Sequence, residues 1–143
     1  MLLAGQAETE ALGARIAAGL RVGDAVTLEG DLGAGKTCLA RAILRALGVE
    51  EDVPSPTFTL VQTYETPKLI VRHYDLYRIK NASEVDELGL EDARDEGAAL
   101  IEWPDRAPSQ IGSDVLSVIL ETVSGNARKA RISGPAKWSA FLA

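Results

Sequence analysis

The stretch VTLEGDLGAGKT, Val26–Thr37, decides the fold of this chain. It begins as a short apolar strand, passes through a glycine-rich turn and reaches Lys36 and Thr37 at the start of a predicted helix. Gly30 and Gly35, together with Lys36 and Thr37, fit the spacing G-x-x-x-x-G-K-[ST] of a phosphate-binding loop. Because this motif requires a strand before it and a helix after it, the sequence predicts a nucleotide-binding site.

The chemistry of such a loop explains its spacing. Glycines let backbone N–H groups turn inward toward phosphate oxygens, and the N-terminus of the following helix adds positive potential. We expect Lys36 to reach the β- and γ-phosphates of a nucleotide and the hydroxyl of Thr37 to bind a magnesium ion.

Length and composition limit the classes of protein to which the chain can belong. We expect one domain spanning residues 1–143, and the net charge of −6 argues against a free-standing nucleic-acid binder, which needs a basic face. Cys38 is the single cysteine, so an internal disulfide is excluded, and a small apolar role is favoured over a redox role. Neither a signal peptide nor a membrane span is recognisable, so we expect a cytoplasmic protein.

Two helices are predicted around the loop. The first covers residues 8–20, where leucine and isoleucine recur at four-residue spacing. Thr9 lies near its start, so its hydroxyl either caps the helix, which the periodicity favours, or contacts a nucleotide base. The second helix covers residues 36–47 and ends at Gly48.

The segment PSPTFT, residues 54–59, contains two prolines that exclude a helix and three hydroxyl groups beside an apolar strand entry. It is either an ordinary connector or a switch segment. In the second case Ser55, Thr57 or Thr59 senses the γ-phosphate or its metal.

A β-hairpin is predicted from residues 58–64 and 69–75, which are β-like runs joined by the turn ETPK. If residues 69–75 run parallel to the strand before the loop, Asp75 ends at the phosphate edge of the sheet. The partner strand then begins at that edge, which brings Thr57 and Thr59 there too.

Further elements follow the hairpin. Residues 83–97 are predicted to form two short helices broken at Gly89, with a capping box made by Ser83 and Asp86. Residues 98–104, AALIEWP, predict a buried strand that leads into an acid. Strands near 114–122 and 127–133 and a short C-terminal helix complete the chain.

A magnesium–nucleotide site needs a carboxylate at a strand end close to Thr37, and two acids compete for this role. Glu102 follows the more convincing apolar run, whereas the run before Asp75 is interrupted by Arg72 and His73. Both acids can serve, one as metal ligand and the other by orienting water, and the sequence does not assign which.

Other side chains near these acids favour structural roles. An acid at a strand end can instead form an ion pair with Arg78 or Arg106, and for Arg78 such a pair is favoured over a role as arginine finger. For His73, the single histidine, a structural role is favoured. Trp103 is either a core anchor or an interface residue.

Together the motifs GDLGAGKT, SPTFT, HYDLYR, ELGLED and IEWP, in this order, resemble the TsaE (YjeE) family over roughly residues 8–133. The resemblance implies an α/β P-loop NTPase fold, three-layered, with a mixed parallel and antiparallel sheet. It also implies an ATPase of tRNA threonylcarbamoyladenosine biosynthesis that uses ATP and magnesium and binds the partner proteins TsaB and TsaD.

The resemblance also implies roles for single residues. Lys36, Asp75 and Glu102 would be catalytic, Thr37 and Glu102 would bind the metal, and Trp103 would be important for activity. Ser55, Thr57 and Thr59 would lie in a switch-like loop. The nucleotide would contact Thr9, Asp31, Leu32, Gly33, Ala34, Gly35, Lys36 and Thr37. Many relatives have a second threonine at the position of Cys38. If that hydroxyl contributes to phosphate binding, the affinity of this chain for phosphate would be altered.

These features favour an ATPase whose hydrolysis resets a tRNA-modifying complex, and they predict slow hydrolysis in isolation because no catalytic arginine or glutamine marks the site. One alternative is a nucleotide-dependent adaptor without essential hydrolysis. Another is a small-molecule kinase, which needs an acceptor pocket and usually an arginine-bearing lid, for which the chain has no long insert.

Overall fold

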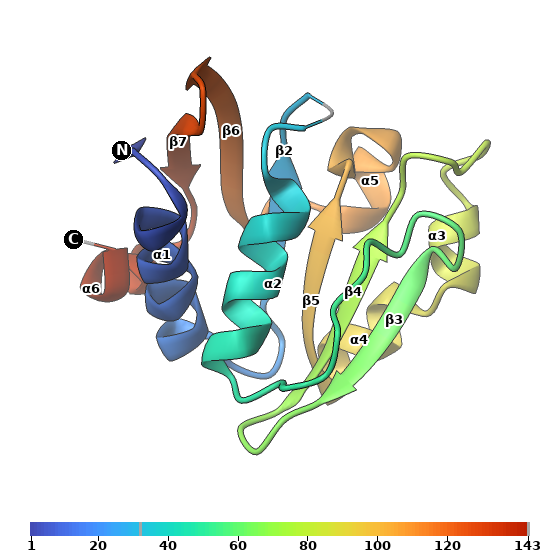
Figure 1. Cartoon of the computed structure of the whole chain (residues 1–143). Helices are drawn as coiled ribbons and strands as arrows, with labels where there is room; N and C mark the ends of the chain where they lie inside the picture. The colour runs from blue at the N-terminus through green and yellow to red at the C-terminus, as the bar shows by residue number, and fades with distance from the viewer. Residues whose placement is uncertain (32, 143) are drawn as a thin grey trace.

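The computed structural model describes residues 1–31 and 33–142 and contains a seven-stranded sheet in the order β1-β7-β6-β2-β5-β4-β3 (Figure 1). The strands are β1 (Leu2–Leu3), β2 (Ala25–Glu29), β3 (Val61–Glu65), β4 (Ile70–Asp75), β5 (Gly97–Glu102), β6 (Leu116–Ser124) and β7 (Ala127–Ser133).

The centre of the sheet is parallel and its edges are antiparallel. Strands β6, β2, β5 and β4 run in the same direction, whereas β3, β7 and β1 pair antiparallel with their neighbours. The predicted hairpin is therefore confirmed, and so is the parallel direction of its second strand. β1 was not expected from the sequence.

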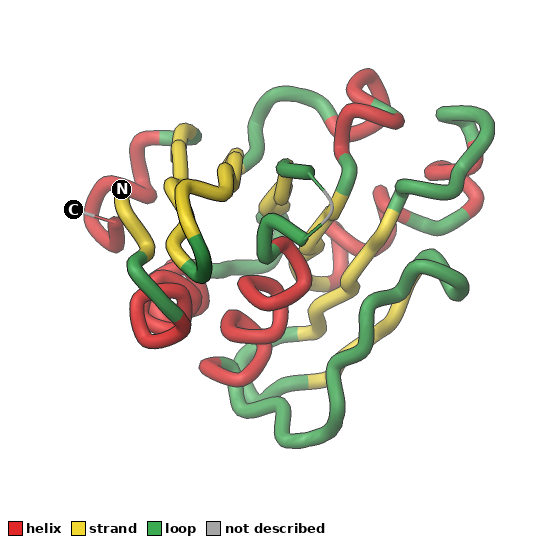
Figure 2. Tube along the Cα trace, turned by 45° about the horizontal axis from the view of Figure 1, so that its top comes forward, coloured by secondary structure: helices red, strands yellow, loops and turns green. Residues whose placement is uncertain are grey.

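Helices cover both faces of the sheet and make three layers (Figures 1 and 2). One face packs against α1 (Gln6–Gly19) and α2 (Lys36–Ala46), and the other against α3 (Glu84–Glu87), α4 (Leu90–Glu96) and α5 (Pro108–Ile111). In β5, Ala98 and Leu100 face the first layer, whereas Ala99 and Ile101 face the second. A strand buried on both faces explains this continuous apolar run. The α/β, three-layer, mixed-sheet prediction is confirmed.

The C-terminal segment packs beside α1. It contains a 3₁₀ turn (Ala136–Trp138) and α6 (Ser139–Leu142), so the predicted short C-terminal helix is confirmed. Trp138 is buried against Gly19 of α1, where an added Cβ would come within 2.6 Å of the indole ring. Among the described residues, no helix is both long enough and apolar enough to cross a membrane.

Three local predictions are wrong. The first helix begins at Gln6, so Thr9 lies inside its first turns, and its hydroxyl donates to the carbonyl of Gly5 (3.4 Å) instead of capping. Ser83 makes no capping hydrogen bond, because its hydroxyl instead donates to Oδ1 of Asn81 (2.9 Å). β3 begins at Val61 and not at residue 58, because a turn closed by the Leu60 amide and the Pro56 carbonyl (2.7 Å) precedes it.

Tyr74 gives the fold a measurable alkaline limit. Its side chain is fully buried on β4, its hydroxyl donates to the carbonyl of Leu88 (3.1 Å), and burial raises its pKa to about 12 from 10.0. Because the pKa of Tyr74 is higher in the folded state, the protonated hydroxyl contributes to the free energy of unfolding. This contribution is complete below pH 10 and is lost as the pH rises to 12.

We therefore expect the advantage of the wild type over Tyr74→Phe in free energy of unfolding to shrink by about 2–3 kcal/mol between about pH 9 and pH 12. Urea unfolding at several pH values measures it. A difference that does not change with pH contradicts this origin of the alkaline loss.

Candidate functional site

The register of the parallel strands gathers the candidate acids at one edge. Asp75 of β4 is paired with Glu102 of β5, and Glu102 is paired with Leu28 of β2, so the three strands end side by side where α2 begins. Because side chains alternate along a strand, His73 and Asp75 point to the same face as Val71, which packs toward α1 and α2. The topological inference about Asp75 is therefore confirmed.

The phosphate-binding loop has the backbone that its glycines predict. Gly33 and Gly35 adopt φ values of 84° and 101°, which side-chain-bearing residues rarely adopt. Gly30 is required for space, because an added Cβ would lie 2.5 Å from the carbonyl oxygen of Leu120. Leu32, a predicted nucleotide contact, lies outside the described residues.

Lys36 is folded back over the loop. Its ammonium group donates to the carbonyls of Gly30 and Asp31, the latter at 3.0 Å, and lies 4.1 Å from the ring centroid of Trp103. Burial lowers the pKa of Lys36, an effect opposed by the negative charges of Glu102 and Asp75. The ammonium group therefore lies in the field of both candidate acids, and its present partners are groups that phosphate oxygens can replace.

Glu102 connects α2 to the sheet. The hydroxyl of Thr37 lies 3.1 Å from each carboxylate oxygen of Glu102, although the two residues are 65 positions apart. Nε2 of His73 lies 2.6 Å from Oε2 of the same carboxylate. Because an ionised carboxylate can only accept, Nε2 donates, and the buried Nδ1 finds no hydrogen-bond partner among the described residues.

Asp75 holds the segment that precedes β3. One of its carboxylate oxygens accepts from Thr57 (3.0 Å) and Ser55 (3.3 Å), and the other accepts from the amide of Tyr77 (3.0 Å). Thr59 is exposed and instead accepts a hydrogen bond from Gln62. Two of the three predicted switch hydroxyls thus lie on the acid, and the third lies elsewhere.

Neither acid is neutralised by an arginine. Across residues 1–31 and 33–142, Asp75 and Glu102 form no ion pair with Arg78 or Arg106, which instead lie over the aromatic rings of Phe58 and Tyr77. The expected ion-pair role of Arg78 is therefore wrong. A carboxylate that is 2% exposed and has a hydroxyl and an imidazole as partners, as Glu102 has, is suited to a cation from solution.

Trp103 follows Glu102 directly in an unusual backbone conformation. Its φ of 60° is rare for a bulky residue, and its ring packs on Tyr77 with 4.7 Å between ring centroids. The same ring covers the ammonium group of Lys36. The indole therefore closes one side of the site.

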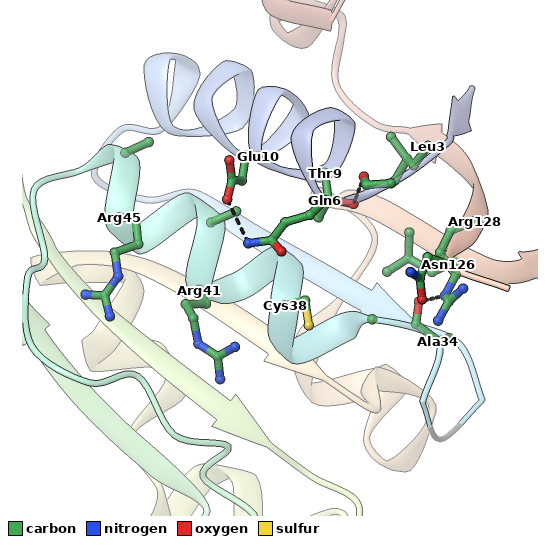
Figure 3. A pocket seen from close by; sticks show the side chains of 15 residues that line it. Leu3, Gln6, Thr9, Glu10, Ala34, Cys38, Arg41, Arg45, Asn126 and Arg128 are labelled. Atoms are coloured by element: carbon green, nitrogen blue, oxygen red, sulfur yellow. Dashed lines mark hydrogen bonds between the residues drawn. The ribbon is translucent and has the colours of Figure 1, made fainter.

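A cavity of about 830 Å³ opens beside the loop (Figure 3). It lies between α1, the length of α2 and the turn that joins β6 to β7, and Thr9, Cys38, Arg41, Asn126 and Arg128 are among the residues that line it. Its volume falls in the range of small-molecule sites. Thr9 and the exposed Cys38 thus line a cavity next to the loop.

The donor set at Thr37 and Glu102 fits magnesium. Magnesium prefers hard oxygen ligands, needs few from the protein and keeps several waters. A hydroxyl and a carboxylate 3.1 Å apart supply two such oxygens. Among the described residues, no group of three or more histidine, cysteine or acidic side chains is placed so that it could hold a metal ion.

Two residues of the site were missed from the sequence. His73 was taken as structural, although its position two residues before Asp75 on a strand places both side chains on one face. Arg128 donates to the carbonyls of Gly33 (3.1 Å) and Ala34 (3.0 Å) in the loop, and no local pattern around residue 128 signals this contact.

Comparison with known proteins decides the family. The family described as "Threonylcarbamoyl adenosine biosynthesis protein TsaE" matches residues 3–130. The chain belongs to the TsaE family. A TsaE protein of Rickettsia felis is 39% identical over 92% of this chain and 78% of its own length, and one of Bacillus subtilis is 36% identical over 85% and 77%. Both relatives are described as tRNA threonylcarbamoyladenosine biosynthesis proteins, so this TsaE family member has a role in tRNA threonylcarbamoyladenosine biosynthesis.

A solved structure agrees with the fold. "Crystal structure of Bacillus subtilus YdiB" matches 99% of this chain and 88% of that chain, with a TM-score of 0.78 and 26% sequence identity. The P-loop NTPase fold predicted for this TsaE family member, with its mixed sheet, is therefore confirmed.

Proposed function

We propose that this chain is a magnesium-dependent ATPase that supports repeated rounds of threonylcarbamoyladenosine modification of tRNA by binding and resetting a partner transferase complex. The observation that carries the ATPase proposal is the contact of the Thr37 hydroxyl with both oxygens of Glu102, beside the ammonium group of Lys36. A phosphate-binding loop, a hydroxyl and a strand-end carboxylate are the parts that magnesium–nucleotide hydrolysis requires.

We infer that the loop from Asp31 to Thr37 binds the phosphates of ATP, with Lys36 moving from the carbonyls of Gly30 and Asp31 to phosphate oxygens. The cavity of about 830 Å³ suits the nucleoside, because it adjoins the loop and is lined by Thr9.

Thr37 and Glu102 would hold the magnesium ion, which supplies positive charge to the β- and γ-phosphate oxygens. His73 fixes the orientation of the Glu102 carboxylate. Asp75 orients the attacking water, either directly or through Ser55 and Thr57, and the segment with Thr59 acts as a switch-like loop. Catalysis then rests on positioning and charge stabilisation without a covalent intermediate.

The resetting role and the partners follow from the family alone. We infer that TsaB and TsaD form the transferase complex, that tRNA is met only through it and that the protein, as one domain, works in the cytoplasm. Trp103 and the exposed Phe58 near the site are candidates for the partner surface.

Hydrolysis is expected to depend on magnesium and to be slow without partners. Release of phosphate from ATP by the purified protein should fall to background when EDTA removes divalent cations and should return when magnesium is added. A malachite-green assay measures the released phosphate. The control is the same protein given calcium in place of magnesium. Fast turnover in EDTA contradicts the proposal.

Reconstitution of the tRNA modification separates the ATPase from its alternatives. With this protein present, the number of modified tRNAs per transferase complex should exceed one, and without it the reaction should stop near one turnover. Equal turnover in both cases overturns the resetting role. Transfer of phosphate to a metabolite instead of water supports the small-molecule kinase.

A further inference from the structure

Arg128 ties the phosphate-binding loop to the turn between β6 and β7. Its Nε donates to the carbonyl of Ala34 (3.0 Å) and its Nη2 to that of Gly33 (3.1 Å). On the other side, Nη1 donates to the carbonyls of Gly125 (2.9 Å) and Ala127 (3.0 Å). One guanidinium group thus joins two segments that lie more than ninety residues apart in the sequence, and Figure 3 shows Arg128 next to Ala34.

These bonds engage carbonyl groups of the loop, whereas a phosphate would engage its amide groups. A phosphate-binding loop works because its amides face inward, and in the same peptide units the carbonyls then face outward. Arg128 donates to two successive carbonyls of the loop, those of Gly33 and Ala34. The amide of Ala34 donates to the carbonyl of Asp31 (3.0 Å), so this part of the loop is held from both sides. Glycines flank this part of the loop, so little else in the local sequence limits its conformation.

The geometry assigns Arg128 a positioning role rather than a catalytic one. Four of its N–H groups are already used by backbone carbonyls, so the fork of the guanidinium group fits the loop and the turn together. Its side chain also lines the cavity beside the loop, together with Asn126 of the same turn.

We propose that Arg128 holds the phosphate-binding loop in its binding-competent shape before the nucleotide arrives, so that the β6–β7 turn controls nucleotide affinity. This rests on the proposed nucleotide-binding function. Ordering a loop in advance improves affinity because the ordering cost is not met at the binding step. Loss of Arg128 therefore weakens nucleotide binding more than it slows hydrolysis at saturating ATP.

The test compares wild type, Arg128→Ala and Arg128→Lys. We expect the Kd for ADP, measured by calorimetry in EDTA, to rise by about tenfold or more in Arg128→Ala, with kcat at saturating ATP within about threefold of wild type. Hydrogen exchange of the amides of residues 33–37 should quicken in the nucleotide-free variant, whereas exchange in β2 and β5 should not. Arg128→Lys keeps the charge but lacks the fork, so most of the loss should remain.

Arg131→Ala is the matched control. Arg131 lies on the same strand, is 65% exposed in its side chain and pairs with Glu121 on the surface, so its loss should leave ADP affinity and loop exchange unchanged. Unchanged affinity and exchange in Arg128→Ala overturn the proposal, as does full rescue by Arg128→Lys, which would make charge alone responsible. If the wild type binds no ADP, the proposed function fails, and loop exchange still tests the role of Arg128.

Discussion

Lys36→Ala is expected to lower kcat/KM for ATP hydrolysis by about a hundredfold to a thousandfold, the loss typical when a fixed donor to transition-state charge is removed. The lysine ammonium group is placed between the loop carbonyls and the ring of Trp103, within the field of Glu102 and Asp75. From there it can reach the phosphates that the loop binds, and alanine has no charge to replace it.

Phosphate release and the Kd for ATP should be measured together for Lys36→Ala. Both should deteriorate, because the ammonium group contacts the phosphates in the ground state as well as in the transition state. Lys129→Ala, which removes an exposed lysine of β7, is the matched control and should behave like wild type. Hydrolysis by Lys36→Ala within about threefold of the wild-type rate would remove Lys36 from the mechanism.

The buried position of Lys36 also has a cost for the nucleotide-free fold. Burial lowers its pKa, so the folded state disfavours the charged form relative to the unfolded chain. The unfolded chain then binds more protons, and this residue makes stability rise with pH between the lowered pKa and 10.5. Lys36→Ala removes the titrating group, so its stability should not show this rise with pH. Because the substitution also removes the cost of burying the ammonium group, we expect its loss of activity to come without unfolding.

The sequence predicted the parts of the site that depend on local chemistry. Glycine spacing, the apolar run before Glu102 and the hairpin turn each limit the backbone directly, and the parallel strands then bring Asp75 and Glu102 into register. Contacts between residues far apart in the sequence were harder to predict. Arg128 reaches the loop because β7 pairs with β6 and β6 with β2, and the residues around it carry no trace of that contact.

Local errors arose where two patterns compete. Thr9 has the residue type of a cap, but the helix begins two residues earlier than predicted, so Thr9 lies inside it. The structural role of His73 stays a prediction, but its residue type did not signal the contact with Glu102, which follows from the alternation of side chains along β4. In both cases the extent or the face of the element decided the contact, and residue type did not.

Trp103 brings the strand end, the lysine and the neighbouring loop together. A positive φ at a bulky residue is unfavourable and persists only when its surroundings fix it. Here the surroundings are the ring of Tyr77, two residues after Asp75, and the ammonium group of Lys36. In the proposed function, movement of Lys36 toward a phosphate would remove one partner of the indole, which directly follows Glu102 and packs on Tyr77.

Glu102→Gln is expected to lower magnesium-dependent hydrolysis by about a hundredfold to a thousandfold while the protein keeps its nucleotide-binding loop. Glutamine has the same size and can bond to Thr37 and His73, but it has no charge with which to hold a cation. Affinity for ADP in EDTA should be close to that of wild type, and the gain in affinity on adding magnesium should be lost.

Binding and activity together decide what Glu102→Gln means. Glu121→Gln removes a surface carboxylate that pairs with Arg131, so it should leave both measurements unchanged. If magnesium still tightens ADP binding by Glu102→Gln, this carboxylate is not a metal ligand, whatever happens to the rate. If hydrolysis is lost but the number of modified tRNAs per transferase complex stays as high as with wild type, nucleotide binding alone resets the complex. The chain then acts as an adaptor, because a step that can be removed without slowing turnover cannot drive it.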